Sequence, residues 1–181
     1  MINKIVSSVT AAVADIHDGA TVMIGGFGTA GMPSELIDAL YRAGEIELEL
    51  VPQGNLAERI RAAGAGIGAF YTPTSYGTQL AEGKETREIG GRNYVLEYPI
   101  HADYALIRAD RADRWGNLVY RKTARNFGPI MASAAHCTIV QVRETVALGG
   151  LDPEAIVTPG IFVHRVVRVP ANGLAEPQAG G

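Results

Sequence analysis

The sequence has few of the residues that cross-link a chain, hold metals or attract polyanions. Cys137 is its one cysteine among 181 residues, so neither an intramolecular disulfide nor a multi-cysteine metal site can form. Its 16 Lys and Arg are outnumbered by 19 Asp and Glu, and a net charge of −3 gives no general electrostatic reason to bind nucleic acid. We therefore expect no metal, no nucleic-acid partner and a reducing, cytoplasmic compartment.

Long apolar runs are also missing. No run approaches the ~18 residues of a membrane span, and the first residues lead into an amphipathic pattern rather than a signal peptide. What the sequence does have is a hydrophobic fraction of 47% and 22 glycines, enough for a buried core with many tight turns. We expect one domain over residues 1–170, no membrane partner, and a flexible tail over 171–181.

The first part of the chain alternates strand and helix patterns. Apolar residues at intervals of three and four positions predict an amphipathic helix over 6–16, and the β-branched run 21–24 predicts a strand buried on both faces. A glycine-rich loop over 25–31 follows. Pro33, a residue favoured at the first helical position, then opens the next helix.

A second unit repeats this order. Ile and Leu alternate with Glu over 45–50, which predicts a strand with one solvent-exposed face, and a turn leads into another helix. Asn55 and Glu58 have the spacing of a capping box, and Gly64 stands where that helix should stop. Two such units predict an α/β fold with an open, mostly parallel sheet and flanking helices.

The second half of the chain predicts additional hairpins. Residues 84–89 and 92–97 flank Gly90-Gly91, a two-residue turn, and residues 104–108 and 118–121 flank a second turn. A short helix over 129–136 and strands over 139–142 and 161–169 complete the pattern.

The glycine loop matches G-x-G-x-x-G from Gly26 to Gly31, so a dinucleotide site is the first hypothesis to test. Pro33 argues against it, because it would fall beyond the first turn of the helix that such a motif opens. No Gly-Lys-Ser or Gly-Lys-Thr follows for a P-loop, and no G-x-S-x-G is present. The four histidines lack metal-ligand spacing: His17, His101, His136 and His164.

The longer stretch over 18–33 resembles the first signature of the family I coenzyme A transferases, in which a hydrophobic strand is followed by Gly-Gly-Phe, a spaced Gly and a Pro. Five further blocks resemble the same family: 51–61, 70–74, 83–85, 113–118 and 124–127. The likeness is to the A (alpha) subunits of bacterial 3-oxoacid coenzyme A transferases. Over 28–38 it is nearer to the 3-oxoadipate enzymes than to the acetoacetate enzymes. The resemblance implies a CoA-transferase/NagB-like fold and transfer of CoA from succinyl-CoA to a 3-oxoacid.

The family's nucleophile is a glutamate in a Ser-Glu-Asn-Gly block of the B (beta) subunit, and this chain lacks that tetrapeptide. The resemblance therefore implies half of an enzyme, a heterodimer or heterotetramer with the B subunit. It also implies a CoA thioester substrate and no permanently bound cofactor. It assigns stabilisation of the oxyanion to Gln53, which also stands at the end of a predicted strand, where ligands gather; the alternative is a turn glutamine bonding its own backbone. It assigns CoA or substrate binding to Gly25, Gly26, Phe27, Gly28, Thr29, Ala30 and Gly31.

Two departures from the family pattern stand out. A strand, an Asn-Asn-rich loop and a helix that normally precede segments like 41–44 are absent between Leu40 and Tyr41, which puts activity in doubt. Ser75 stands where the family has Gly, and serine tolerates positive φ poorly. Two alternatives remain: the A subunit of an acetoacetate or other short-chain acyl CoA-transferase, and a non-catalytic acyl-CoA-binding module. The basic residues are expected to form a solvated face: Arg121, Lys122 and Arg125.

Overall fold

The computed structural model describes residues 2–28, 30–42, 51 and 53–169. Its main sheet has the order β1-β9-β8-β6-β2, and β7 pairs with β6 outside this path. The pairings are parallel except for that of β7, which is antiparallel. This confirms the predicted α/β class with a mostly parallel sheet. The strands are β1 Ile5–Val6, β2 Val22–Ile24, β6 Ala102–Asp113, β7 Leu118–Val119, β8 Ala135–Val146 and β9 Arg165–Arg168.

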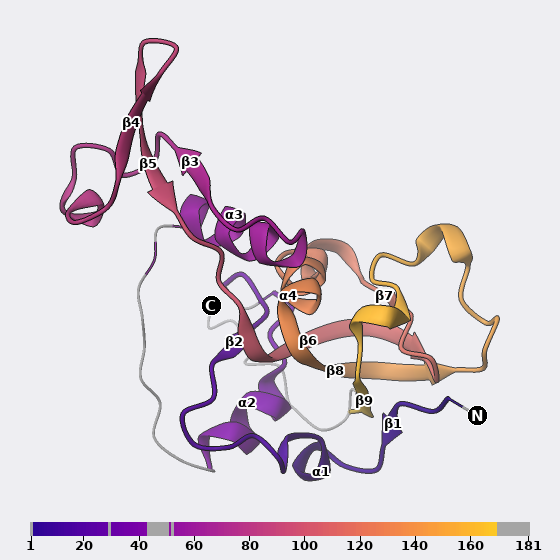
Figure 1. Cartoon of the computed structure of the whole chain (residues 1–181). Helices are drawn as coiled ribbons and strands as arrows, with labels where there is room; N and C mark the ends of the chain where they lie inside the picture. The colour runs from indigo at the N-terminus through magenta and orange to yellow at the C-terminus, as the bar shows by residue number, and fades with distance from the viewer. Residues whose placement is uncertain (1, 29, 43–50, 52, 170–181) are drawn as a thin grey trace, which may run out of the picture.

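Helices cover both faces of this sheet (Figure 1). Helices α1 (Val9–Val13) and α2 (Ser34–Tyr41) pack on one face, and α3 (Gln53–Gly64) and α4 (Gly128–Ala134) lie on the other. Because strand side chains alternate between faces, β6 contributes to two hydrophobic clusters. Leu106 packs with the α1 and α2 side, and Ile107 packs with α3 and α4.

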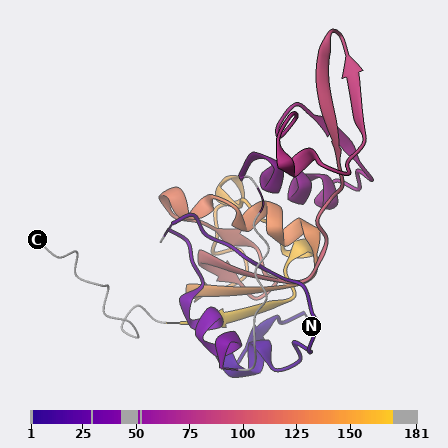
Figure 2. The same cartoon turned by 90° about the vertical axis from the view of Figure 1, so that its left-hand side faces the viewer.

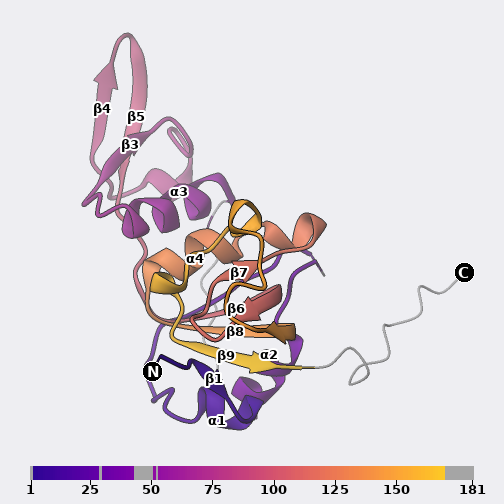
Figure 3. The same cartoon turned by 90° about the vertical axis from the view of Figure 1, so that its right-hand side faces the viewer.

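A small antiparallel sheet projects from the α3 side of the body (Figures 1, 2 and 3). We call it the arm. Its order is β3-β5-β4, from β3 (Phe70–Thr72), β4 (Thr86–Ile89) and β5 (Arg92–Glu97). Gly90 and Gly91 form the turn with φ of 59° and 77°, which confirms the predicted hairpin. The described part of the chain contains four short 3-10 helices: Gln79–Ala81, Lys122–Arg125, Pro153–Ala155 and Gly160–Phe162.

The predicted helix over 6–16 is wrong at both ends, because α1 spans only Val9–Val13. Val6 belongs to β1 and pairs with Val167 of β9, although its spacing from Val9 fits a helix. Helix α1 begins only after Ser8, whose side chain accepts a hydrogen bond from the Ala11 backbone N–H at 3.1 Å. A side-chain cap and a strand pairing distant in sequence thus override the local apolar period.

Other predicted boundaries move by a few residues. Pro33 is the N-cap of α2 rather than its first residue. The predicted strand 139–142 is the middle of the 12-residue β8, which takes residues 135 and 136 from the predicted short helix. Within 161–169 only Arg165–Arg168 is a strand, because a 3-10 helix ends at Phe162. The hairpin between β6 and β7 is confirmed by the pairing of Ala112 with Leu118.

Two predicted segments lie outside the described residues. These are the strand over 45–50 and the tail over 171–181. Among the residues that the structure describes, β2 is the last strand at its end of the main sheet. No helix in those ranges is long and apolar enough to cross a membrane.

Candidate functional site

The glycine loop leaves the sheet directly at the end of β2. The Gly25 backbone N–H donates to the Leu106 carbonyl oxygen of β6 at 2.8 Å, which continues the strand pairing by one residue. Gly25 is buried, and a side chain there would meet the Cγ2 atom of Ile107 at 3.3 Å. The first glycine of the loop therefore allows the loop to begin inside the core.

The tip of the loop is a tight turn that presents an aromatic ring. Phe27 and Ala30 exchange backbone hydrogen bonds of 3.0 and 3.1 Å, and the Phe27 side chain is 63% exposed. Thr29, which the family resemblance assigns to binding with its neighbours, lies outside the described residues. The turn is closed by its own backbone hydrogen bonds and leaves the Phe27 ring largely exposed.

The glycines of this loop serve different purposes. Gly26 has φ of 132°, and a Cβ added there would lie 2.7 Å from Met32 Cγ. Gly28 has φ of 58° and nothing within 4 Å of an added Cβ. Packing and backbone conformation together explain Gly26, whereas only its backbone conformation constrains Gly28 within the described structure. Gly28 is therefore the position with room for a ligand.

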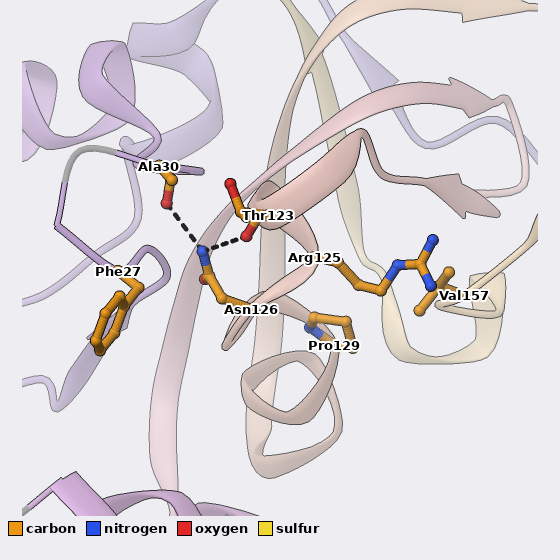
Figure 4. Close-up of a pocket in the computed structure, with 7 residues that line it drawn as sticks. All are labelled: Phe27, Ala30, Thr123, Arg125, Asn126, Pro129 and Val157. Atoms are coloured by element: carbon orange, nitrogen blue, oxygen red, sulfur yellow. Dashed lines mark hydrogen bonds between the residues drawn. The ribbon is translucent and has the colours of Figure 1, made fainter.

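An open depression of about 610 Å³ lies beside the loop (Figure 4). Its walls are mostly apolar, and among the described residues that line it only Arg125 carries a formal positive charge. Figure 4 shows the Arg125 side chain extending away from Phe27 towards Val157. The depression is lined by Phe27, Ala30, Thr123, Arg125, Asn126, Pro129 and Val157. Such a depression can receive an apolar group that lies next to an anionic one.

Gln53 is the first residue of α3, and its side chain is exposed. Within the described residues it does not line the depression. The strand expected before it, over 45–50, lies outside the described residues. Its assignment to the oxyanion thus stays a prediction.

The predicted capping box is wrong. Helix α3 begins at Gln53, so Asn55 is its third residue and is only 3% exposed. The Asn55 amide Nδ2 donates to Glu97 at 3.0 Å and to Ser75 Oγ at 3.3 Å. Its Oδ1 is buried without a hydrogen-bond partner in the part of the chain that is described. This asparagine joins helix α3 to the arm.

Glu97 is the centre of a charged cluster that sequence reasoning missed. Its carboxylate is 2% exposed and lies 2.7 Å from Lys84 Nζ and 3.8 Å from Arg59 Nε. Glu97 itself could have indicated this cluster. A carboxylate at an inward-facing position of a strand needs a cation or a hydrogen-bond donor beside it. We call Asn55, Arg59, Lys84 and Glu97 the arm junction.

Ser75, at the edge of the arm junction, has φ of 72°. The position therefore does take the left-handed conformation for which glycine was expected. Serine adopts this conformation at a cost of about 1 kcal/mol. Its hydroxyl is the acceptor for Asn55, a contact that glycine would not make.

The remaining candidates form no site in the described ranges. His164 Nδ1 accepts from the Thr138 backbone N–H at 3.0 Å, and burial lowers the pKa of this imidazole. Cys137 is half-buried, and burial raises the pKa of its thiol. No group of three His, Cys, Asp or Glu residues is placed to hold a metal among the described residues. The basic residues Arg121, Lys122 and Arg125 are exposed.

Comparison with known proteins gives a consistent family. The family model described as coenzyme A transferase matches residues 6–44 and 40–169. The chain is 56% identical to the A subunit of 3-oxoadipate CoA-transferase from Pseudomonas putida, over 93% of this chain and 95% of that protein. The protein of the same name from Acinetobacter baylyi is 53% identical over 93% and 96%. The A subunit of the succinyl-CoA:3-ketoacid coenzyme A transferase from Xanthomonas campestris is 45% identical over 84% and 83%.

The alignment with the Pseudomonas putida protein also shows how many residues of that relative this chain lacks. It runs over 219 positions, whereas 93% of this 181-residue chain is about 168 residues. About 50 positions of that relative therefore have no counterpart here. The two ranges that match the family model meet at residues 40–44.

Solved structures share the fold. An acyl-CoA transferase of E. coli O157:H7, in a thioester complex with CoA, aligns over 98% of this chain with a TM-score of 0.80 and 20% identity. This chain spans about half (49%) of that protein. Glutaconate coenzyme A-transferase of Acidaminococcus fermentans aligns over 92% of this chain and 76% of its own, with a TM-score of 0.79 and 18% identity.

Proposed function

Because the chain belongs to the coenzyme A transferase family, we propose that it is the A subunit of a 3-oxoacid CoA-transferase that moves CoA from succinyl-CoA to 3-oxoadipate. The observation that carries this proposal is the 56% identity with the A subunit of a 3-oxoadipate CoA-transferase over nearly the whole of both chains. The lower identity of 45% with a succinyl-CoA:3-ketoacid relative favours 3-oxoadipate over other 3-oxoacids.

The nucleophile comes from a separate B subunit, since this chain has no Ser-Glu-Asn-Gly block. A glutamate of that partner attacks the succinyl thioester and releases CoA as a thiolate, which leaves a mixed anhydride. The thiolate attacks the glutamyl carbonyl to give a glutamyl-CoA thioester and free succinate. The carboxylate of the acceptor acid then attacks the glutamyl-CoA carbonyl and releases CoA as a thiolate, which leaves a second mixed anhydride. The thiolate attacks the acceptor's acyl carbonyl in that anhydride, which gives the new acyl-CoA and frees the glutamate.

This chain supplies the surroundings of the thioester. The exposed ring of Phe27 and the walls of the depression receive the methylene groups of the acyl chain or of the pantetheine arm. The open space around Gly28 lets the main chain approach the same ligand. Arg125 at the depression pairs with an anionic group of the substrate.

Gln53 stabilises the oxyanion that forms when the thioester is attacked. Its side-chain amide is exposed at the first turn of α3, so it is free to donate to a ligand held between the two subunits. Such a donor contributes a few kcal/mol when it points at the developing charge.

The experiment mixes the purified chain with the B subunit of the Pseudomonas putida enzyme and follows transfer from succinyl-CoA to 3-oxoadipate. A second chain carries the relative's ~50 unmatched residues, which we place between Leu40 and Tyr41. Transfer is expected only in the mixtures, and faster with the restored segment, because that segment adds a strand, a loop and a helix. If neither chain gives transfer with the B subunit, the proposed function is wrong.

A further inference from the structure

One side chain, Asn126, ties the glycine loop to the segment that precedes α4. Its amide Nδ2 donates to the Ala30 carbonyl oxygen at 2.9 Å and to the Thr123 carbonyl oxygen at 2.8 Å (Figure 4). Its Oδ1 accepts from the Phe127 backbone N–H at 2.6 Å. One amide group thus joins two segments that are 96 residues apart in the chain.

The other hydrogen bonds of the loop leave its far end unattached. The Gly25 bond to Leu106 fixes the start, and the bonds between Phe27 and Ala30 close the turn on itself. Apart from the bond from Asn126, no side-chain hydrogen bond reaches the described residues of the loop, 25–28, 30 and 31. The position of the turn relative to the depression therefore depends on this contact.

A close backbone approach supports the same attachment. Gly31 has φ of 76°, and a Cβ added there would lie 3.0 Å from the backbone of Ala124. The glycine thus allows the loop to rest directly on the 122–125 segment. Asn126 and Ala124 hold the loop from two neighbouring positions.

The segment that holds the loop is itself strained. Lys122 has φ of 49°, a conformation that costs a non-glycine residue roughly 1–2 kcal/mol. Strain of this kind persists only where the surroundings hold it, and it is concentrated at functional sites. The Asn126 bonds to Thr123 and Phe127 fix the shape of this segment from within.

We propose that Asn126 is a positioning residue: it holds the glycine loop at the edge of the depression and so sets the affinity for the CoA thioester. The second half of this statement rests on the proposed function, and the first half does not. Asn126 acts through the loop rather than on the reacting atoms. Its loss weakens thioester binding more than it slows the chemical step.

The first test measures hydrogen–deuterium exchange in the full chain without a partner. Asn126→Ala removes the donor and the acceptor, and Asn126→Asp keeps the Oδ1 acceptor but turns a carboxylate oxygen towards two carbonyl oxygens. Both variants should exchange faster over residues 25–33, by about five- to tenfold, the effect of losing one or two net hydrogen bonds. Exchange over β8 should not change. Asn93→Ala and Asn93→Asp, at an exposed position of the arm, are matched controls.

The second test measures transfer with the B subunit present. Asn126→Ala should raise the KM for succinyl-CoA about fivefold and change kcat by less than about twofold. A merely structural asparagine would lower the melting temperature and leave this KM unchanged.

Unchanged exchange over 25–33 in both variants would overturn the proposal. So would faster exchange with an unchanged KM in an active two-subunit enzyme. If neither the unmodified chain nor the chain with the restored segment shows transfer, the proposed function fails, and the exchange experiment still decides whether Asn126 holds the loop.

Discussion

The arm junction and the attachment of the glycine loop use the same device with different chemistry. In each, an asparagine Nδ2 joins two distant segments, Asn55 to Glu97 and Asn126 to Ala30. The acceptor at the arm junction is a buried carboxylate that is also paired with Lys84, whereas the acceptors for Asn126 are the neutral carbonyl oxygens of Ala30 and Thr123. Hydrogen bonds to charged groups are roughly twice as strong as those between neutral groups. The difference indicates a rigid joint at the arm and a looser one where a ligand must enter and leave.

Each region also contains one non-glycine residue in the left-handed conformation. These are Ser75 beside the arm junction and Lys122 beside the glycine loop, and no others occur among the described residues. Strain is thus present in both regions, but of the two only the arm junction holds a buried carboxylate paired with cations.

The largest expected effect on stability is the loss of the buried charge. Glu97→Ala leaves Asn55 and Lys84 without their shared acceptor and should lower the free energy of unfolding by about 3 kcal/mol. This is the lower end of the usual range because Lys84 is 37% exposed and can regain water. Urea denaturation checks it. Arg87→Ala, which breaks the exposed pair with Glu85, should cost less than about 1 kcal/mol. If both variants lost the same free energy of unfolding, the arm junction would be no more stabilising than an exposed ion pair.

Gln53 starts the helix that the arm junction fixes, so its substitution should affect catalysis rather than folding. Gln53→Ala should lower kcat and kcat/KM together by roughly 10² or more, because an oxyanion donor acts in the transition state. The side chain is exposed, so the melting temperature should barely change. The comparison is with Asn126→Ala, which should raise KM instead. A normal kcat in the two-subunit enzyme would remove the catalytic assignment of Gln53.

The attachment of the glycine loop, the looser of the two joints, can be probed at Gly28. Gly28→Val forces a branched residue to a φ of 58° with nothing within 4 Å, so its cost to stability should be about 1–2 kcal/mol. If the main chain meets a ligand there, transfer should fall by about tenfold or more. Gly66→Val is the matched control, since Gly66 has φ of 70° and equally open surroundings outside the loop. The assignment of Gly28 fails if both variants keep the same activity.

The smallest expected effects are gains in stability from relieving strain. Ser75→Gly and Lys122→Gly should each gain about 0.5–1 kcal/mol from the left-handed backbone alone. Ser75→Gly should gain less, because it also removes the acceptor for Asn55. Thermal unfolding of the two variants, side by side, measures this difference. A larger gain at Ser75 would show that its hydroxyl contributes nothing to the arm junction.

Local patterns predict those elements whose causes are local. The turn at Gly90-Gly91 is confirmed because two positive φ values need glycine. The strand predicted over 21–24 is present at Val22–Ile24, where β-branched residues fit it, but only Met23 in it is buried, so the predicted burial on both faces is wrong. Gly64 is the last residue of α3, where its sequence position predicts the end of a helix. In each case the residues that decide the structure are neighbours in the chain.

Contacts between distant segments escape prediction. Asn55 has the spacing of a cap, but its partner Glu97 is 42 residues away, and the helix begins two residues before it. Val6 fits a helical period but pairs with Val167. The attachment of Ala30 by Asn126 escapes for the same reason, although Asn126 lies in a block that resembles the family.

The central claim is that this chain supplies half of a CoA-transferase site and that the nucleophile lies in its partner. The most direct measurement is intact mass spectrometry of both chains after incubation with succinyl-CoA and no acceptor acid. We predict that the B subunit gains the mass of covalently bound CoA when this chain is present, that it does not when incubated alone, and that this chain stays unmodified. A CoA adduct on this chain, or the same adduct on the B subunit in its absence, would contradict the account.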